Sequence, residues 1–270
     1  MKNTKKRGMV KAGLLFLVLI LMGGVPHAHA FLGFGNSASW KEEVLLHDGG
    51  KIVVTRSQTR GGRGEVGQSP IKEHSITFTP SGEEKAITWK DEYSEDVGHS
   101  NFDLLALHLL NNTPYIVASS YGCLAYNKWG RPNPPYIVFK YDGTVWQRIP
   151  LSEVPVEFTA INLVINASAH EKKLLDLGVV SAAMVKKFNS SLTQPEFKTI
   201  IRTPFETGKN SASNVDCLEL VPDGKNGWLG IDWFSSEQSY SACLKVCEMK
   251  KMSAKFCPCD TLLKTNSKWR

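Results

Sequence analysis

The sequence predicts a mainly β protein, an antiparallel meander, followed by a smaller α/β segment held by disulfides. Three observations support this fold class. Short β-branched and aromatic runs fill residues 40–155, turn residues separate these runs, and five of the six cysteines follow residue 215. A sandwich, a barrel and a partial propeller all fit such a meander, and the sequence leaves the choice between them open.

The first 30 residues have the form of a secretory signal peptide. Five basic residues and no acidic one precede an apolar run over residues 12–25, and Ala28-His29-Ala30 offers small residues where a signal peptidase reads them. Cleavage after Ala30 would make the protein periplasmic or secreted. The apolar run is shorter than the roughly 20 residues that span a bilayer. An uncleaved N-terminal anchor in the inner membrane is the alternative.

The charge balance argues against nucleic acid as a partner. The chain holds 32 Lys and Arg against 26 Asp and Glu, and five of the basic residues lie in the first 30. After cleavage 27 basic residues would face 26 acidic ones, a net charge of +1. Nucleic-acid binding needs a basic patch or stripe. The expected parts are the signal peptide (1–30), an antiparallel β domain (31–165) and an α/β segment with the cysteine cluster (166–270).

Four turn motifs predict four hairpins in the β domain, because Asp-Gly and Asn-Asn tolerate the positive φ angles of tight turns. They are Asp48-Gly49-Gly50, Pro80-Ser81-Gly82, Asn111-Asn112 and Asp142-Gly143. In the last hairpin, a two-residue turn at Asp142-Gly143 would pair Phe139 with Trp146. Ile137, Phe139, Tyr141 and Trp146 would then share one face, the more apolar one, as expected of a core face.

Residues 126–135 cannot form a central strand, because their three prolines lack the ladder donor. The segment must cross the surface or cap one end of a sheet. In one interpretation Trp129 folds back and plugs that end. In the other, Tyr126, Trp129, Arg131 and Asn133 contact a ligand such as a sugar or a peptide.

The glycine-rich residues 61–69 lack the spacing of a phosphate-binding or dinucleotide-binding loop. We interpret them as a mobile loop between strands. Loops carry function more often than scaffolds do, so Arg60, Arg63 and Glu65 are candidates for contacting a partner, with Arg63 the residue we select.

Further along the chain, residues 157–168 and 196–204 are expected to form strands, the second ended by Pro204. Residues 181–191 have near-helical apolar spacing with Ser181 as N-cap. Residues 235–255 have helix composition, and Ser235 or Ser236 could cap that helix.

An even number of cysteines in an exported chain predicts disulfides. The simplest pairing links Cys243 and Cys247 to Cys257 and Cys259, and Cys123 to Cys217. The four clustered thiols could instead bind zinc or act in redox chemistry. Their C-x3-C-x9-C-x-C spacing differs from the usual paired motifs. We therefore expect structural disulfides, with no metal and no cofactor.

Motifs of known catalytic sites are absent from the sequence, which contains neither G-x-S-x-G nor H-E-x-x-H. His108 lies in an alternating run and is expected to be a satisfied sheet residue. Four carboxylates crowd residues 91–96. They could serve glycoside hydrolysis, collect calcium, or line a solvated loop. They are Asp91, Glu92, Glu95 and Asp96.

The segment CLAYNKWGRPNPPYIVFKYDG, together with the signal-peptide form, resembles exported proteins of Gram-negative bacteria to which no function is assigned. The run YDGTVWQRIPL also resembles the outer strands of β-propeller blades. Neither resemblance implies a catalytic residue. The sequence is interpreted as a non-enzymatic binding or envelope-associated module whose partner is an envelope glycan, a peptide or a protein. A secreted glycan-acting hydrolase that uses the loop carboxylates is the alternative.

Overall fold

The computed structural model describes residues 37–64, 69–206 and 215–263. The signal-peptide expectation for residues 1–30 lies outside these ranges, as do residues 65–68 of the glycine-rich loop. No helix among the described residues is long and apolar enough to cross a membrane.

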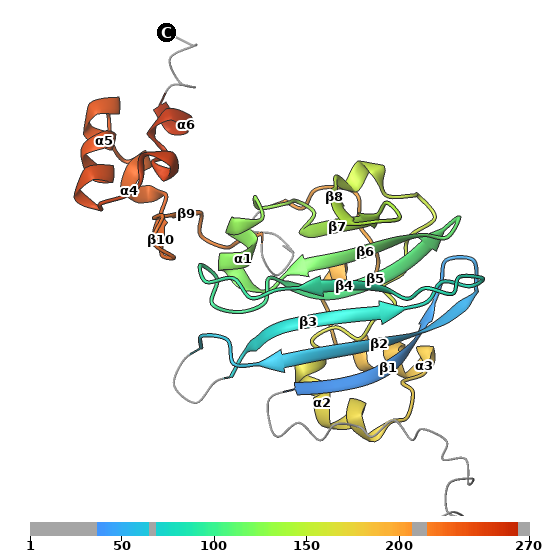
Figure 1. The fold of residues 1–270 in the computed structure, drawn as a ribbon. Coiled ribbons are helices and arrows are strands. Elements are labelled where there is room, and N and C mark those ends of the chain that lie inside the picture. The colour runs from blue at the N-terminus through green and yellow to red at the C-terminus, as the bar shows by residue number, and fades with distance from the viewer. Residues whose placement is uncertain (1–36, 65–68, 207–214, 264–270) are drawn as a thin grey trace, which may run out of the picture. The chain divides into compact units, whose positions relative to one another are not determined.

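Eight strands form two four-stranded antiparallel sheets, each a simple meander in chain order (Figure 1). The first sheet contains β1 (Ser37–Leu45), β2 (Lys51–Arg60), β3 (Ile71–Phe78) and β4 (Ile87–Asp91). The second contains β5 (Phe102–Leu110), β6 (Thr113–Ser120), β7 (Tyr136–Tyr141) and β8 (Trp146–Ile149). The mainly β, antiparallel fold class is therefore confirmed.

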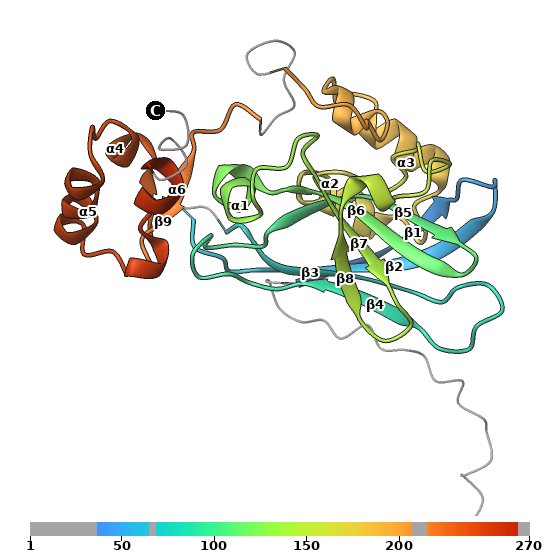
Figure 2. The ribbon, with the colours of Figure 1, turned by 90° about the horizontal axis from the view of Figure 1, so that it is seen from above.

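A single apolar cluster joins the two sheets, so the meander is a sandwich (Figure 2). Ile76 and Trp89 from the first sheet pack in this cluster with Leu104, Ile116 and Phe139 from the second. Alternation along each strand explains this, because every second side chain of a strand points to the same face.

All four predicted turns connect neighbouring antiparallel strands. At Asn111 and Asn112 the φ angles are 51° and 59°. These are the left-handed values that Asn tolerates better than most residues, and they let Leu110 pair directly with Thr113.

The predicted register of the last hairpin is wrong by two residues. Tyr141 pairs with Trp146, and Phe139 pairs with Arg148 rather than with Trp146. The turn is centred one residue later because the Asp142 carboxylate accepts hydrogen bonds from the backbone N–H groups of Thr144 and Val145. A shift of two residues keeps the side-chain alternation, so Ile137, Phe139, Tyr141 and Trp146 still share one face.

The strands expected at 157–168 and 196–204 are not formed. These segments meet in an isolated bridge between Ala160 and Thr199, and only short 3-10 turns, η1 (Leu151–Glu153) and η2 (Pro195–Phe197), lie nearby in the chain. The Asn162 side chain explains why no strand forms here. Its oxygen accepts a hydrogen bond from Leu107 N, and its nitrogen donates to Leu107 O and Leu45 O, so a side chain takes the place of backbone ladder bonds.

Irregular chain nevertheless covers the outer face of the second sheet. Val154, Phe158 and Ile200 pack on Tyr115 and Val138. Both faces of β6 and β7 are therefore buried, which explains their nearly continuous apolar sequences.

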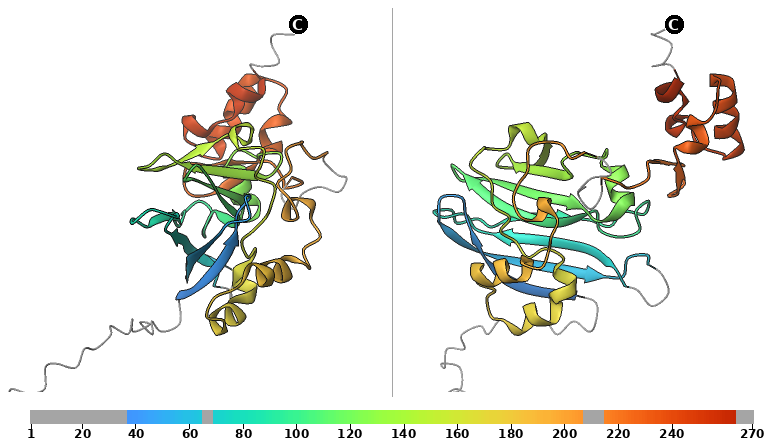
Figure 3. Two further views of the ribbon diagram at one scale, coloured as in Figure 1. Left: turned by 90° about the vertical axis from the view of Figure 1, so that its right-hand side faces the viewer. Right: turned by 180° about the vertical axis from the view of Figure 1, so that it is seen from behind.

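Three helices accompany the sandwich: α1 (Gly122–Lys128), α2 (Ala167–Asp176) and α3 (Ala182–Asn189). Ser181 caps α3 by accepting a bond from Met184 N, as expected. α2 and α3 lie against β1 (Figure 3). Trp40 of β1 shares an apolar cluster with Leu174 of α2 and Val185 of α3, across the boundary that the sequence suggested after residue 165.

The C-terminal segment has its own small core around Phe234 and two disulfides. It contains a hairpin of β9 (Leu220–Pro222) and β10 (Trp228–Gly230), then α4 (Asp232–Ser235), α5 (Tyr240–Met249), η3 (Ala254–Phe256) and α6 (Cys259–Leu263). The predicted N-cap of α5, Ser235 or Ser236, is wrong. Ser239 is the N-cap, and its hydroxyl accepts a hydrogen bond from Ala242 N, because Ser235 is already the last residue of α4.

Candidate functional site

A cavity of about 400 Å³ lies where the β4–β5 loop meets the end of α1. It brings together two features that the sequence analysis treated separately, Trp129 and the acidic residues 91–96. Five aromatic rings and six charged side chains contribute to its wall. The rings are Trp89, Tyr93, Phe102, Trp129 and Phe139, and the charged residues are Lys90, Asp91, Glu92, Glu95, Asp96 and Lys128.

The aromatic floor belongs to the core of the sandwich. Trp89, Phe102 and Phe139 are buried, and their ring centroids lie 5.4–6.0 Å apart. Trp129 is only partly buried and lies 4.7 Å from Phe102, centroid to centroid. Such tilted ring contacts are favourable aromatic geometries.

Trp129 therefore packs against the end of the sandwich, as the plug interpretation expected. Its indole N–H donates to Asn101 Oδ1 over 3.2 Å, and the Arg148 guanidinium lies over the ring at 5.5 Å. The same side chain also forms part of the cavity wall. Plugging the sheet and facing a ligand are thus compatible roles for this residue.

Asp91 holds the acidic loop in place. Its carboxylate accepts bonds from Asn101 N at 2.7 Å, Phe102 N at 2.8 Å and Asn101 Nδ2 at 2.9 Å. His74 Nε2 lies 3.1 Å from the same group and completes four contacts. A buried carboxylate surrounded in this way is a structural anchor, because few lone pairs remain for a ligand.

The other carboxylates face solvent to different degrees. Asp96 pairs with Lys128 over 2.7 Å, and Glu92 lies 3.5 Å from Lys90. Glu92 and Glu95 are exposed. With four carboxylates against two ammonium groups, the cavity wall carries a formal charge of −2 and favours neutral or cationic ligands.

Arg63 lies beside this loop. Its guanidinium donates to Glu95 O over 2.9 Å, and its backbone N–H donates to Gly98 O. The side chain selected as a partner-binding candidate thus supports the backbone of the acidic loop. Direct contact of Arg63 with a ligand stays a prediction.

Three other predicted binding residues hold the chain together. The buried Tyr126 donates its hydroxyl to Pro132 O. Asn133 makes two bonds with the backbone of Phe205, at 2.8 and 2.7 Å. Arg131 donates to the carbonyl oxygens of Cys217 and Leu218. These contacts explain the polar residues without a ligand, and a ligand role for them stays a prediction.

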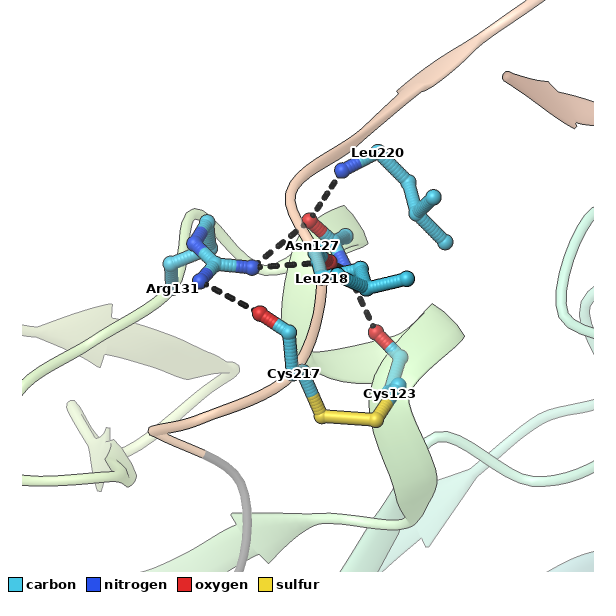
Figure 4. The surroundings of a disulfide bond; sticks show 6 residues. All are labelled: Cys123, Asn127, Arg131, Cys217, Leu218 and Leu220. Carbon is cyan, nitrogen blue, oxygen red and sulfur yellow. Dashed lines mark hydrogen bonds between the residues drawn. A yellow bond between two sulfur atoms is a disulfide. The ribbon is translucent and has the colours of Figure 1, made fainter. Parts of the chain in front are cut away.

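Arg131 belongs to a clamp around the disulfide between Cys123 and Cys217 (Figure 4). Asn127 completes it. Its side-chain oxygen accepts from Arg131 and from Leu220 N, and its amide nitrogen donates to the carbonyl oxygens of Cys123 and Leu218. The clamp attaches the chain around residue 217 to α1.

The remaining disulfides link Cys243 and Cys247 to Cys257 and Cys259, as expected. The individual pairs, which the sequence left open, are Cys243 with Cys259 and Cys247 with Cys257. The Cys247, Cys257 and Cys259 sulfur atoms lie within 4.8 Å of one another. Because each sulfur is used in a disulfide, none is a thiolate that could hold zinc or act as a nucleophile.

Sequence reasoning missed several residues of the cavity. Trp89, Phe102 and Phe139 come from three different strands, and Asn101 supports both Trp129 and Asp91. Strand alternation could have assigned the three rings to a core face. No local signal showed that they would lie under the acidic loop.

Comparison of the chain with protein-family models, with curated proteins and with solved structures finds no match. The functional argument therefore rests on the geometry of the chain itself.

Proposed function

We propose that this is an exported protein, periplasmic or secreted, that binds an envelope glycan in the cavity formed by Trp129 and the acidic loop. It holds the sugar without catalysing a reaction on it. The observation that carries the proposal is the partly exposed Trp129 ring beside the exposed carboxylates of Glu92 and Glu95.

The chemistry of this cavity suits a sugar ring. An aromatic face offers an apolar surface to the C–H face of a pyranose, while carboxylate oxygens accept hydrogen bonds from its hydroxyl groups. A volume of about 400 Å³ falls in the range of small-molecule sites. The formal charge of −2 disfavours acidic sugars, so neutral and amino-substituted sugars are the expected ligands.

Export is supported by the form of the first 30 residues and by the use of all six cysteines in disulfides. Such bonds persist in oxidising compartments.

The non-catalytic role is favoured by the carboxylates themselves. Asp91 is fully engaged and Asp96 forms an ion pair, which leaves Glu92 and Glu95, both exposed. A glycosidase needs two carboxyl groups at a set separation, one of them acting as a proton donor in sheltered surroundings. A secreted glycan-acting hydrolase using Glu92 and Glu95 remains the alternative function for the same cavity.

The test is calorimetric titration of the secreted form with glucose, N-acetylglucosamine, glucosamine and glucuronate. We expect binding of neutral or amino sugars and at least tenfold weaker binding of glucuronate. The double variant Glu92→Gln with Glu95→Gln should lose at least tenfold in affinity. The matched control, Glu83→Gln with Glu84→Gln, changes two exposed carboxylates in the β3–β4 turn and should bind like the parent.

Two outcomes would overturn the proposal. Equal affinity of both double variants for the preferred sugar would remove the acidic loop from binding. Release of reducing ends from envelope glycan, abolished by the Glu92 and Glu95 changes alone, would replace the binding protein with the hydrolase.

A further inference from the structure

A second cavity, of about 470 Å³, lies between β1, α3 and the irregular chain on either side of it. Most of its wall is apolar. The contributing side chains include Leu45 of β1, Ile161, Val185 of α3 and Phe197, together with Ala160 and Ala182. None of these residues belongs to the proposed glycan site.

The amide side chains in this wall already have partners. Asn162 bonds Leu107 and Leu45, and Asn189 accepts from Ile165 N and donates to Leu163 O. They therefore offer little to a polar ligand. A molecule that fills the cavity must bury an apolar part there.

The charge in this wall is entirely positive. Lys186 and Lys198 are its charged residues, and both are exposed. The Lys198 ammonium donates to Ser190 O over 3.1 Å, which holds it beside the cavity. No ion pair joins either lysine to a carboxylate within the described ranges. Two uncompensated ammonium groups beside an apolar cavity favour an anionic head group.

We infer that this cavity binds a single-chain anionic amphiphile, a fatty acid, with its acyl chain against Val185 and Phe197 and its carboxylate between Lys186 and Lys198. The complementarity is twofold: an apolar wall for the chain and a positive rim for the head group. The glycan cavity, whose wall is negative, would reject the same ligand.

The first experiment titrates the full exported chain with octanoate, decanoate and laurate below their micelle concentrations. Affinity should rise about fourfold for each methylene that becomes buried. Dodecanol has the same chain as laurate and no charge, so it should bind at least tenfold more weakly. Dodecyl phosphate has the same chain as laurate but carries a phosphate head group, as a lysophospholipid does. Tighter binding of dodecyl phosphate than of laurate would overturn the assignment to a fatty acid.

The second experiment compares variants. Lys186→Gln with Lys198→Gln should weaken laurate binding at least tenfold and leave dodecanol binding unchanged. Lys172→Gln with Lys173→Gln, on the exposed side of α2, is the matched control and should bind laurate like the parent. Ala182→Leu places extra carbon in the cavity and should weaken laurate more than octanoate.

Affinity that does not depend on chain length would overturn the inference, and so would equal laurate binding by the two lysine double variants. Circular dichroism of each variant establishes that it is folded. Failure of sugar binding would leave this inference intact, because the two cavities share no lining residue.

Discussion

The buried His108 should make the protein lose stability on mild acidification. Its side chain, near the C-terminal end of β5, has 0% exposure, and its ring stacks on Phe158 with 4.6 Å between centroids. His108 Nε2 lies 2.9 Å from Ala160 O, so this nitrogen carries the hydrogen. Nδ1 is buried without a hydrogen-bond partner, and a second proton would have to be placed there.

Burial lowers the pKa of His108 from 6.5 to about 4, with a smaller contribution from His47, while the bond to Ala160 raises it. The folded-state pKa thus lies below the unfolded-state value. Stability from the neutral ring is complete above pH 6.5 and is lost as the pH falls towards 4, because the unfolded chain takes up the proton first. A shift of this size corresponds to about 3 kcal/mol.

The assay is urea unfolding without reductant at several pH values from 7.5 to 4, for the parent and for His108→Gln. The glutamine amide can still donate to Ala160 O but does not titrate. The free energy of unfolding of the parent should fall by about 3 kcal/mol more than that of the variant across this range. Parallel stability curves for the two proteins would refute the reasoning.

Three other predictions concern buried or bridging groups. Burial raises the pKa of Asp103, so its protonated form stabilises the fold at low pH and this contribution is lost as the pH rises through the folded-state pKa. Asp103→Asn should therefore raise the free energy of unfolding at pH 7 and flatten its pH dependence in urea titrations. Cys123→Ser with Cys217→Ser opens a loop of 94 residues and should cost about 4–5 kcal/mol in the same assay. Asn162→Ala leaves the N–H and C=O of Leu107 without their side-chain partner and should cost about 2–4 kcal/mol, with increased amide hydrogen exchange at Leu107 as a local readout.

Part of the candidate glycan site was visible in the sequence as separate features. Trp129 and the carboxylates of residues 91–96 were both candidates, but nothing local indicated that they would meet. They come from loops more than 30 residues apart, and the packing of β4 on β5 and β7 brings them together. Arg63, which follows β2, reaches the same loop by donating to Glu95 O.

Errors arose where a side chain replaced the expected backbone partner. The Asp142 carboxylate accepts hydrogen bonds from the backbone N–H groups of Thr144 and Val145, which shifts the last hairpin turn by one residue. Asn162 bonds both backbone groups of Leu107, so the chain crosses the sheet rather than joining it as a strand. A β-branched run has the same local strand propensity whether it pairs with a strand or is held by side-chain hydrogen bonds, so propensity does not distinguish the two.

The sequence by itself determined the antiparallel meander and its four hairpins, because each depends on neighbours in the chain. It narrowed the cysteine pairing to Cys123 with Cys217 and to links between two pairs in the C-terminal cluster, and the structure decided which partners join within that cluster. Only the tertiary structure decided that the two meanders pack face to face. It also decided which loops enclose a cavity and which lysines remain without a carboxylate. Those outcomes depend on side chains from distant segments filling one shared volume, and the periodicity of any single segment does not contain that information.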